Sequence, residues 1–176
     1  NITVGDFYAK TTWGKDDYGV SILQVNEGGT VNFNADKAAF DGSTNVAGGV
    51  FGSGGWGMLN VTANELSIDG NICGTYGTLT GNQHAATAFD LNITAGNLVM
   101  AGDINAGSIG DGYSKHDRTT NIAVNVTDTA ELTGDINVYE RGNIAVSSDT
   151  MNWKGSAVVN KGTLDISKVN NLTLKL

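Results

Sequence analysis

The sequence has no proline, only one cysteine and few aromatic residues. Proline cannot donate to a strand ladder, so its absence suits a chain whose backbone N–H groups nearly all enter β-sheets. Because Cys73 is alone, an internal disulfide and a thiolate metal site are excluded, and we expect Cys73 to pack as a small hydrophobic residue. With 7% aromatic residues, no conventional sandwich core is obvious.

Positive charge is also scarce, because the sequence has ten Lys and Arg residues against eighteen Asp and Glu residues, which gives a net charge of −8. No basic stripe is present to neutralise phosphate groups, which argues against a nucleic-acid partner. The acidic balance is ordinary for a secreted, soluble surface protein. The sequence starts at Asn1 and shows no signal peptide or transmembrane run, so we expect a mature product or an excised segment, without direct membrane insertion.

A short phrase of alternating apolar and polar residues returns about every 33 residues, which is the mark of a repeat architecture. Its copies are Leu59-Asn60-Val61-Thr62, Leu91-Asn92-Ile93-Thr94 and Val124-Asn125-Val126-Thr127, with looser copies at residues 23–26 and 157–160. A second phrase follows each copy, in the apolar pairs Val31/Phe33, Leu66/Ile68, Leu98/Met100, Ala130/Leu132 and Leu164/Ile166. Three of these pairs are closed by Gly70, Gly102 and Gly134.

The alternation has the period of two that is typical of a half-buried strand. A third short strand is expected after each glycine, at Ile72, Ile104 and Ile136. Three strands per repeat, each pairing with the equivalent strand of the next repeat, predict a parallel β-helix of about five coils. We expect one domain over residues 1–176, with an N-terminal edge at 1–19 and repeats at 20–176. Short helical fragments are plausible only at 36–40 and 84–89.

The predicted register places two columns of apolar residues inside the stack. One column contains Val61, Ile93 and Val126, and the other contains Ile68, Met100 and Leu132. A β-sandwich or jelly roll is the alternative fold, because it also consists of short alternating strands separated by turns. A sandwich, however, has no reason to repeat its sequence at a fixed period.

Four longer loops are expected at equivalent places, near residues 41–55, 74–88, 106–121 and 139–155. In a solenoid such insertions project from one face, and that face is often the binding face. The candidate binding residues on these loops are Tyr76, Tyr113, His116, Arg118, Tyr139 and Arg141. The alternative interpretation is that the loops are solvated turns, with a few aromatic side chains pinning them to the stack.

Candidate catalytic residues are weak. His116 and Asp117 are neighbours, but no Gly-x-Ser-x-Gly elbow supplies a nucleophile. Glycoside hydrolysis needs two carboxylates on neighbouring rungs, whereas we interpret Asp69, Asp103 and Asp135 as turn residues that cap their own backbone. The two histidines lack metal-ligand spacing, and the calcium-binding nonapeptide does not recur. We therefore predict no enzyme activity, no cofactor and no metal.

Several Asn-x-Thr triplets match the N-glycosylation acceptor, and the candidate acceptors within the repeats are Asn60, Asn92 and Asn125. The alternative is a polar outer face on which stacked asparagines share side-chain hydrogen bonds.

The coils at residues 130–137 and 160–166, rich in glycine, asparagine and threonine, resemble the passenger domains of Gram-negative autotransporter adhesins. The resemblance lies in composition and period and covers most of residues 20–176. It implies a right-handed β-helix on the bacterial outer surface, with adhesion or self-association as its role. It implies no fixed functional residues.

Two functions are consistent with the sequence. The first is a non-catalytic extracellular adhesin or scaffold segment, whose partner is a host surface protein, a glycan or another copy of the chain. The second is a fibre subunit that polymerises through its terminal strands, at residues 2–7 and 172–176, because unpaired strand edges invite association. A β-helical polysaccharide-active enzyme is a third hypothesis.

Overall fold

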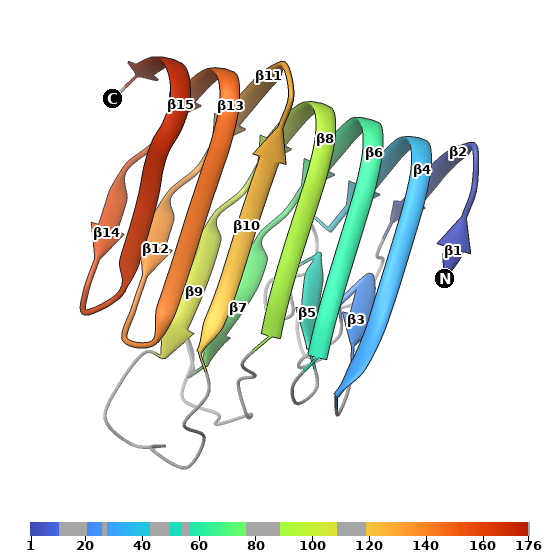
Figure 1. The fold of residues 1–176 in the computed structure, drawn as a ribbon, viewed down its shortest axis with the longest axis horizontal. Helices are drawn as coiled ribbons and strands as arrows, with labels where there is room; N and C mark the ends of the chain where they lie inside the picture. Colours follow the sequence, from blue (N-terminus) through green and yellow to red (C-terminus); the bar gives the residue numbers. More distant parts are fainter. Residues whose placement is uncertain are drawn as a thin grey trace.

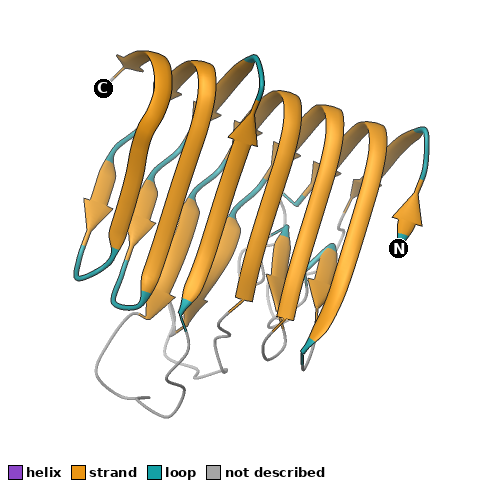
Figure 2. Cartoon of the chain, viewed as in Figure 1, coloured by secondary structure: helices purple, strands orange, loops and turns teal. Residues whose placement is uncertain are grey.

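The computed structural model describes residues 1–10, 21–25, 28–42, 50–53, 57–76, 89–108 and 119–175. Within these ranges every regular element is a β-strand and no helix occurs (Figure 2). The prediction of an almost wholly β chain is therefore confirmed. The short helix considered at residues 36–40 is wrong, because these residues continue a strand in which Ala38 and Phe40 are buried. The other fragment, at 84–89, lies outside the described residues except for Phe89, which begins a strand.

The described strands form two sheets in which every pairing is parallel. The nine-stranded sheet contains β1 (Ile2–Thr3), β2 (Asp6–Lys10), β4 (Gly29–Asp41), β6 (Gly57–Asp69), β8 (Phe89–Ala101), β10 (Thr120–Val126), β11 (Thr129–Thr133), β13 (Gly142–Lys154) and β15 (Thr163–Lys175). The six-stranded sheet contains β3 (Leu23–Val25), β5 (Phe51–Ser53), β7 (Ile72–Tyr76), β9 (Ile104–Ser108), β12 (Ile136–Val138) and β14 (Ala157–Val159).

The chain alternates between the two sheets, and each return to a sheet adds a strand beside the previous one. In Figure 1 the long strands run side by side and bend over together, so that their second halves pass to the back of the molecule. The short strands lie behind the first halves, and the N- and C-termini lie at opposite ends of the stack. One level thus consists of a bent long strand followed by a short strand. We number the levels from the N-terminal end.

The core lies between the sheets and is built from columns of apolar side chains, one from each level. Ile68, Met100 and Leu132 form one column through consecutive backbone pairings, as the sequence predicted. Phe40 precedes them in this column and Trp153 follows them, and all five side chains are buried. Phe7, Phe33, Phe40 and Phe51 add edge-to-face and tilted ring contacts near the N-terminal end, with centroids 4.9–5.5 Å apart.

The other predicted column is only partly right. Val61 pairs with Ile93 as expected, but Ile93 pairs with Val124 and not with Val126. Val126 pairs with Ala95 instead. The predicted alignment was therefore displaced by two residues at this level. A displacement of two keeps a side chain on the same face of a strand, so Val126 is still buried.

The levels do not keep a constant period of 33 residues. Hydrogen bonds between side chains of neighbouring levels show the spacing. The side-chain amides of Asn60, Asn92 and Asn143 donate to residues that lie 28, 32 and 22 positions earlier in the chain. The nine strands of the large sheet occupy seven levels, because β1 shares a level with β2 and β10 shares one with β11. The prediction of about five coils of roughly 33 residues each is corrected accordingly.

The last levels are short because they have no insertion. The loop predicted at 139–155 is wrong, since residues 142–154 form β13, a strand of thirteen residues with alternating burial. The looser phrase copies were also misplaced. Residues 23–25 and 157–159 lie in short strands of the smaller sheet, and Leu164 pairs with Ile144 at the start of a long strand. Of the other predicted loops, residues 51–53, 74–76, 106–108 and 120–121 are wrong, because they belong to strands β5, β7, β9 and β10. Residues 43–49, 54–55, 77–88 and 109–118 of these loops lie outside the described residues.

Candidate binding surface

A column of glycines turns the chain from each long strand into the short strand that follows. Gly70, Gly102 and Gly134 have φ angles of 132°, 143° and 137°, which L side chains rarely adopt. A Cβ atom on Gly102 would collide with the carbonyl oxygen of Gly70, and one on Gly134 would collide with that of Gly102. Glycine is required here because successive backbones approach closely at this corner.

The residue after each glycine caps the backbone of the next level. Asn71 Oδ1 accepts from the Asp103 N–H at 2.8 Å, and Asp103 Oδ1 accepts from the Asp135 N–H at 2.8 Å. Asp135 Oδ1 accepts from the Ser156 N–H at 2.8 Å and from its hydroxyl at 2.9 Å. For Asp103 and Asp135, the predicted capping of their own backbone is therefore corrected. Asp69 lies one level before Ala101 at the end of β6 and is not part of this series.

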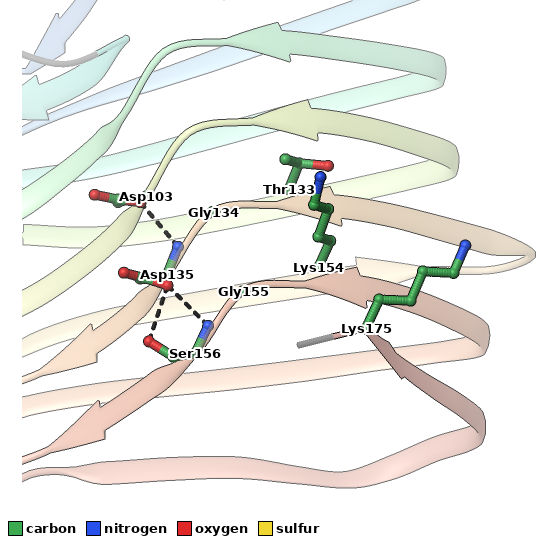
Figure 3. A pocket seen from close by; sticks show the side chains of 8 residues that line it. All are labelled: Asp103, Thr133, Gly134, Asp135, Lys154, Gly155, Ser156 and Lys175. Carbon is green, nitrogen blue, oxygen red and sulfur yellow. Dashed lines mark hydrogen bonds between the residues drawn. The ribbon is translucent and has the colours of Figure 1, made fainter.

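An open groove of about 450 Å³ lies over the last glycine turns (Figure 3). It is lined by Asp103, Thr133, Gly134, Asp135, Lys154, Gly155, Ser156 and Lys175. Figure 3 shows Asp103, Asp135 and Ser156 one below another along the turns, with Lys154 and Lys175 on the ends of the neighbouring long strands. Thr133 pairs with Lys154, and Lys154 pairs with Lys175, so the two ammonium groups belong to one column.

The groove offers a ligand two kinds of charged group: carboxylates that accept hydrogen bonds and ammonium groups that donate them. Its carboxylates follow one another along the same side, and each uses one oxygen to hold the next level. A glycosidase instead places its two carboxyl groups on either side of the scissile bond. The arrangement offers hydrogen bonds to a polar ligand, such as a polyhydroxylated chain.

Comparisons with protein-family models, with curated proteins and with solved structures give no match to this chain. In the described ranges there is also no helix with the length and apolar character needed to cross a membrane. No three His, Cys, Asp or Glu side chains of those ranges are grouped closely enough to hold a metal ion.

Two of the predicted binding residues lie together at a different turn. Tyr139 and Arg141 belong to the turn between β12 and β13, which is closed by a hydrogen bond of 2.9 Å from the Gly142 N–H to the Tyr139 carbonyl. Arg141 is exposed and has a φ of 63°, and Lys161 repeats this conformation one level later with a φ of 61°. Lys161 lies 3.5 Å from a Glu140 carboxylate oxygen, which joins the two turns.

The other predicted binding residues are not brought into a described site. The Tyr76 backbone ends strand β7. Tyr113, His116 and Arg118 lie outside the described residues. Of the predicted binding residues, only Tyr139 and Arg141 lie together in a described turn. Neither lines the groove, whose residues lie on the turns that follow β8, β11 and β13 and at the ends of β11, β13 and β15.

The candidate glycosylation residues point out of the stack, and two of them form a ladder. Asn60 Nδ2 donates to Asn32 Oδ1 at 2.7 Å, and Asn92 Nδ2 donates to Asn60 Oδ1 at 2.8 Å. Asn125 is exposed, and its Oδ1 accepts from the Ser147 hydroxyl at 3.0 Å. This asparagine ladder is the feature that the alternative interpretation of the triplets predicted.

Sequence reasoning missed the lysines and the serine of the groove. Lys154 and Ser156 flank Gly155, in the same way that Thr133 and Asp135 flank Gly134. The signal that could have found them is the recurrence of glycine followed by Asn, Asp or Ser, at Gly70, Gly102, Gly134 and Gly155. It was obscured because the period of 33 residues placed Gly155 in a loop.

Two ion pairs and one set of hydrogen bonds shift the pKa of three charged groups on the outer surface. Lys10 Nζ lies 2.7 Å from Asp41 Oδ2, and this hydrogen bond raises the pKa of Lys10. Lys37 Nζ lies 2.9 Å from Glu65 Oε2, and the pKa of Lys37 is raised for the same reason. Hydrogen bonds from the Ser167 hydroxyl and N–H lower the pKa of Asp165. All three shifted groups are at the surface and are open to screening by salt.

Proposed function

We propose that the chain is a right-handed parallel β-helix that acts as a non-catalytic extracellular scaffold or adhesin segment. The observation that supports this proposal is the residue-by-residue register of the long strands over successive levels. For example, β6 and β8 pair without interruption except at one corner position, from Gly57 with Phe89 to Asp69 with Ala101. Such a stack holds its outer side chains in fixed rows, which is the property that a rigid binding surface needs.

The groove over the glycine turns is the surface that we propose for attachment. Its backbone is fixed by the capping series, so a partner would meet Asp135, Lys154 and Lys175 in a preformed arrangement. Preformed sites bind with a smaller entropy cost than mobile loops do. A hydroxyl-rich glycan or a polar surface of a host protein fits this mixture of donors and acceptors. The resemblance to adhesin passenger domains agrees with a bacterial outer-surface location.

A binding experiment tests the proposal. The purified chain would be applied to arrays of glycans and of host surface proteins. Asp135→Asn preserves the Oδ1 that accepts from Ser156 and removes one charge, and Lys175→Gln removes a charge on the other flank. We expect each change to weaken capture about tenfold, which is a typical effect of removing one charged contact. Thr62→Gln, at an exposed position in the first half of β6 that does not line the groove, is the control and should bind as the parent chain does.

Enzyme activity is the outcome that would overturn this function. If the chain cleaves acidic or neutral polysaccharides, and if Asp103→Asn or Asp135→Asn abolishes cleavage, the groove is a catalytic site. Equal binding by the parent chain and both groove variants would instead show that partners attach elsewhere.

A fibre subunit remains a second candidate function, and one observation favours it. Apolar side chains are exposed on the outermost strands at both ends of the stack, including Ile2 in β1 and Leu172 and Leu174 in β15. A strand that exposes its edge and its apolar side chains is a template for another strand.

A further inference from the structure

The C-terminal end of the stack exposes side chains that belong to the core columns. We call the side of β14 and β15 that faces away from β12 and β13 the C-terminal face. Leu172 and Leu174 continue the columns of Met151 and Trp153. Met151 and Trp153 are 0% and 4% exposed, whereas Leu172 and Leu174 are 40% and 53% exposed. The exposure arises because no described strand covers this face.

The N-terminal end presents the other side of the same columns. We call the side of β1 and β2 that faces away from β4 the N-terminal face. Ile2 pairs with Phe33 and is 40% exposed, although Phe33 is buried. Phe7 and Ala9 pair with Ala38 and Phe40 and are only partly buried. Both faces therefore show inward-pointing apolar residues that one more level would cover.

The pairings of the long strands specify which residues share a column at the two faces. Following them from level to level places Tyr8 in a column with Ala39, Ser67, Val99, Glu131, Asn152 and Thr173. In the same way Phe7 shares a column with Leu172, and Ala9 shares one with Leu174. A second copy stacked on the C-terminal face in the same register would set Phe7 on Leu172 and Ala9 on Leu174.

Charge is distributed unevenly between the two ends. Residues 139–176 contain five Lys or Arg and three Asp or Glu, a net charge of +2. Residues 1–138 carry −10, which together with +2 gives the −8 of the whole chain. Lys154, Lys161, Lys168 and Lys175 are all exposed on the last two levels. Two C-terminal faces would therefore repel each other, whereas the N-terminal face, on which Asp6 and Lys10 balance, does not repel a C-terminal face.

The side-chain ladder also has a direction that lets it continue between copies. Asn32, Asn60 and Asn92 each donate an amide hydrogen to the preceding level, and the first acceptor is Asn1 Oδ1. The last member of this column is Asp165, through Ala123 and Ala145. Asp165 offers carboxylate oxygens as acceptors at the C-terminal face, and Asn1 has an amide donor at the other face.

We propose that the C-terminal face binds the N-terminal face of a second copy of this chain, in the register that continues its columns. This inference deepens the fibre function and rests on the stacked levels described above. The contact is head-to-tail, so it leaves one free face at each end and produces open chains of copies. Lys10 and Lys175 fall in one column and would repel each other, but Asp41 already pairs with Lys10 at 2.7 Å.

Sedimentation velocity over a range of concentrations tests the association. We expect the parent chain to form a series of oligomers that lengthens as the concentration rises. Leu174→Glu should weaken association at least tenfold. Val99→Glu is a matched control, because Val99 is 55% exposed in the middle of the stack and should leave the series unchanged. A parent chain that stays monomeric at every concentration overturns the proposal, and so does an equal loss in the two variants.

Disulfide trapping tests the register, in a background of Cys73→Ser. Tyr8→Cys on one copy and Thr173→Cys on another should cross-link, because neighbouring parallel strands place such Cα atoms about 5 Å apart. Tyr8→Cys with Asn171→Cys is displaced by two residues along the strand, beyond the reach of a disulfide, and should not cross-link. Preference for the second pair overturns the proposed register.

An intramolecular pair separates failure of docking from failure of the architecture. Asn60→Cys and Asn92→Cys lie on paired residues of β6 and β8 and should form a disulfide within one chain. If this bond forms and the intermolecular bond does not, docking is wrong and the stack stands. If neither bond forms, the stacked levels themselves are wrong, and the scaffold function that depends on them is also lost.

Discussion

Replacing Ile93 with aspartate should unfold the protein or nearly do so. Ile93 is 0% exposed and lies between Val61 and Val124 in a core column. A carboxylate at this position has apolar neighbours above and below it. Parallel stacking leaves little room for the side chain to turn outward, because the adjacent positions of the strand belong to the opposite face.

The magnitude follows from two contributions. Loss of a fully buried isoleucine costs about 1.5–3 kcal/mol. An unpaired polar group in the core costs about 1–3 kcal/mol more when it is neutral, and more again when it is charged. The sum, about 2.5–6 kcal/mol for the neutral carboxyl, approaches the whole free energy of unfolding of an ordinary domain, about 5–15 kcal/mol. Burial raises the pKa of the new carboxyl, so the loss should grow as the pH rises above about 4.

Two neighbouring substitutions make the prediction specific to the register. Thr94→Asp changes an exposed outward residue and should alter stability by no more than about 0.5 kcal/mol. Asn92→Asp is an intermediate case, because it replaces the amide that donates to Asn60 Oδ1 and brings two acceptors together. We expect it to cost about 1 kcal/mol, the usual contribution of one hydrogen bond.

Urea and thermal unfolding followed by circular dichroism would measure the three variants. We expect the loss of stability to be largest for Ile93→Asp, intermediate for Asn92→Asp and smallest for Thr94→Asp. If Thr94→Asp were the most destabilising variant, the register would be shifted by one residue and the strand faces exchanged. If all three variants were tolerated equally, the stacked core would be refuted.

Other substitutions test single contacts. Ser148→Ala should stabilise the protein by about 1 kcal/mol in urea melts, because its buried hydroxyl has no hydrogen-bond partner, whereas Ser147→Ala removes a bonded hydroxyl and should destabilise it by about as much. Gly102→Ala should cost about 2–4 kcal/mol because its Cβ meets a backbone carbonyl at positive φ, and Gly5→Ala, with nothing near its Cβ, should cost little. The pKa of Lys10 is raised in the folded state, so the stability that its ion pair with Asp41 contributes is fully present below pH 10.5. That stability is lost as the pH rises through the pKa of Lys10 in the folded protein. Lys10→Met should therefore reduce the alkaline fall in the urea midpoint, and an unchanged fall would show that the ion pair contributes nothing.

The sequence predicted the strands well where apolar alternation was strong. Val61 with Ile93, and Ile68 with Met100, were aligned correctly because whole phrases matched on both faces. The alignment failed at Val126, because Val124-Asn125-Val126-Thr127 resembles the phrase when it is displaced by two residues. A displacement of two residues leaves every inward residue inward and every outward residue outward, so the apolar periodicity alone could not reveal it.

The late levels and the groove were harder to predict for a related reason. Residues 142–154 alternate as a strand, yet a loop was expected there because the earlier levels contain insertions at that place. Once Gly155 is aligned with Gly134, Lys154 and Ser156 fall beside Thr133 and Asp135. Hydrogen bonds that cross between levels, such as Asp103 to Asp135, depend on the stack itself and leave no local signature in the sequence.

Distances along the exposed column of Thr3, Asn34, Thr62, Thr94, Asn125 and Ser147 test the stacked levels most directly. Spin labels would be attached by cysteine at Thr3 and Asn125, and separately at Thr3 and Ser147, in a Cys73→Ser background, and measured by double electron–electron resonance. The account predicts backbone separations of about 19 Å and about 24 Å, so that one level adds about 4.8 Å whether it contains 31 residues or 22. Equal separations in the two pairs, or a shorter one for Ser147, would contradict it.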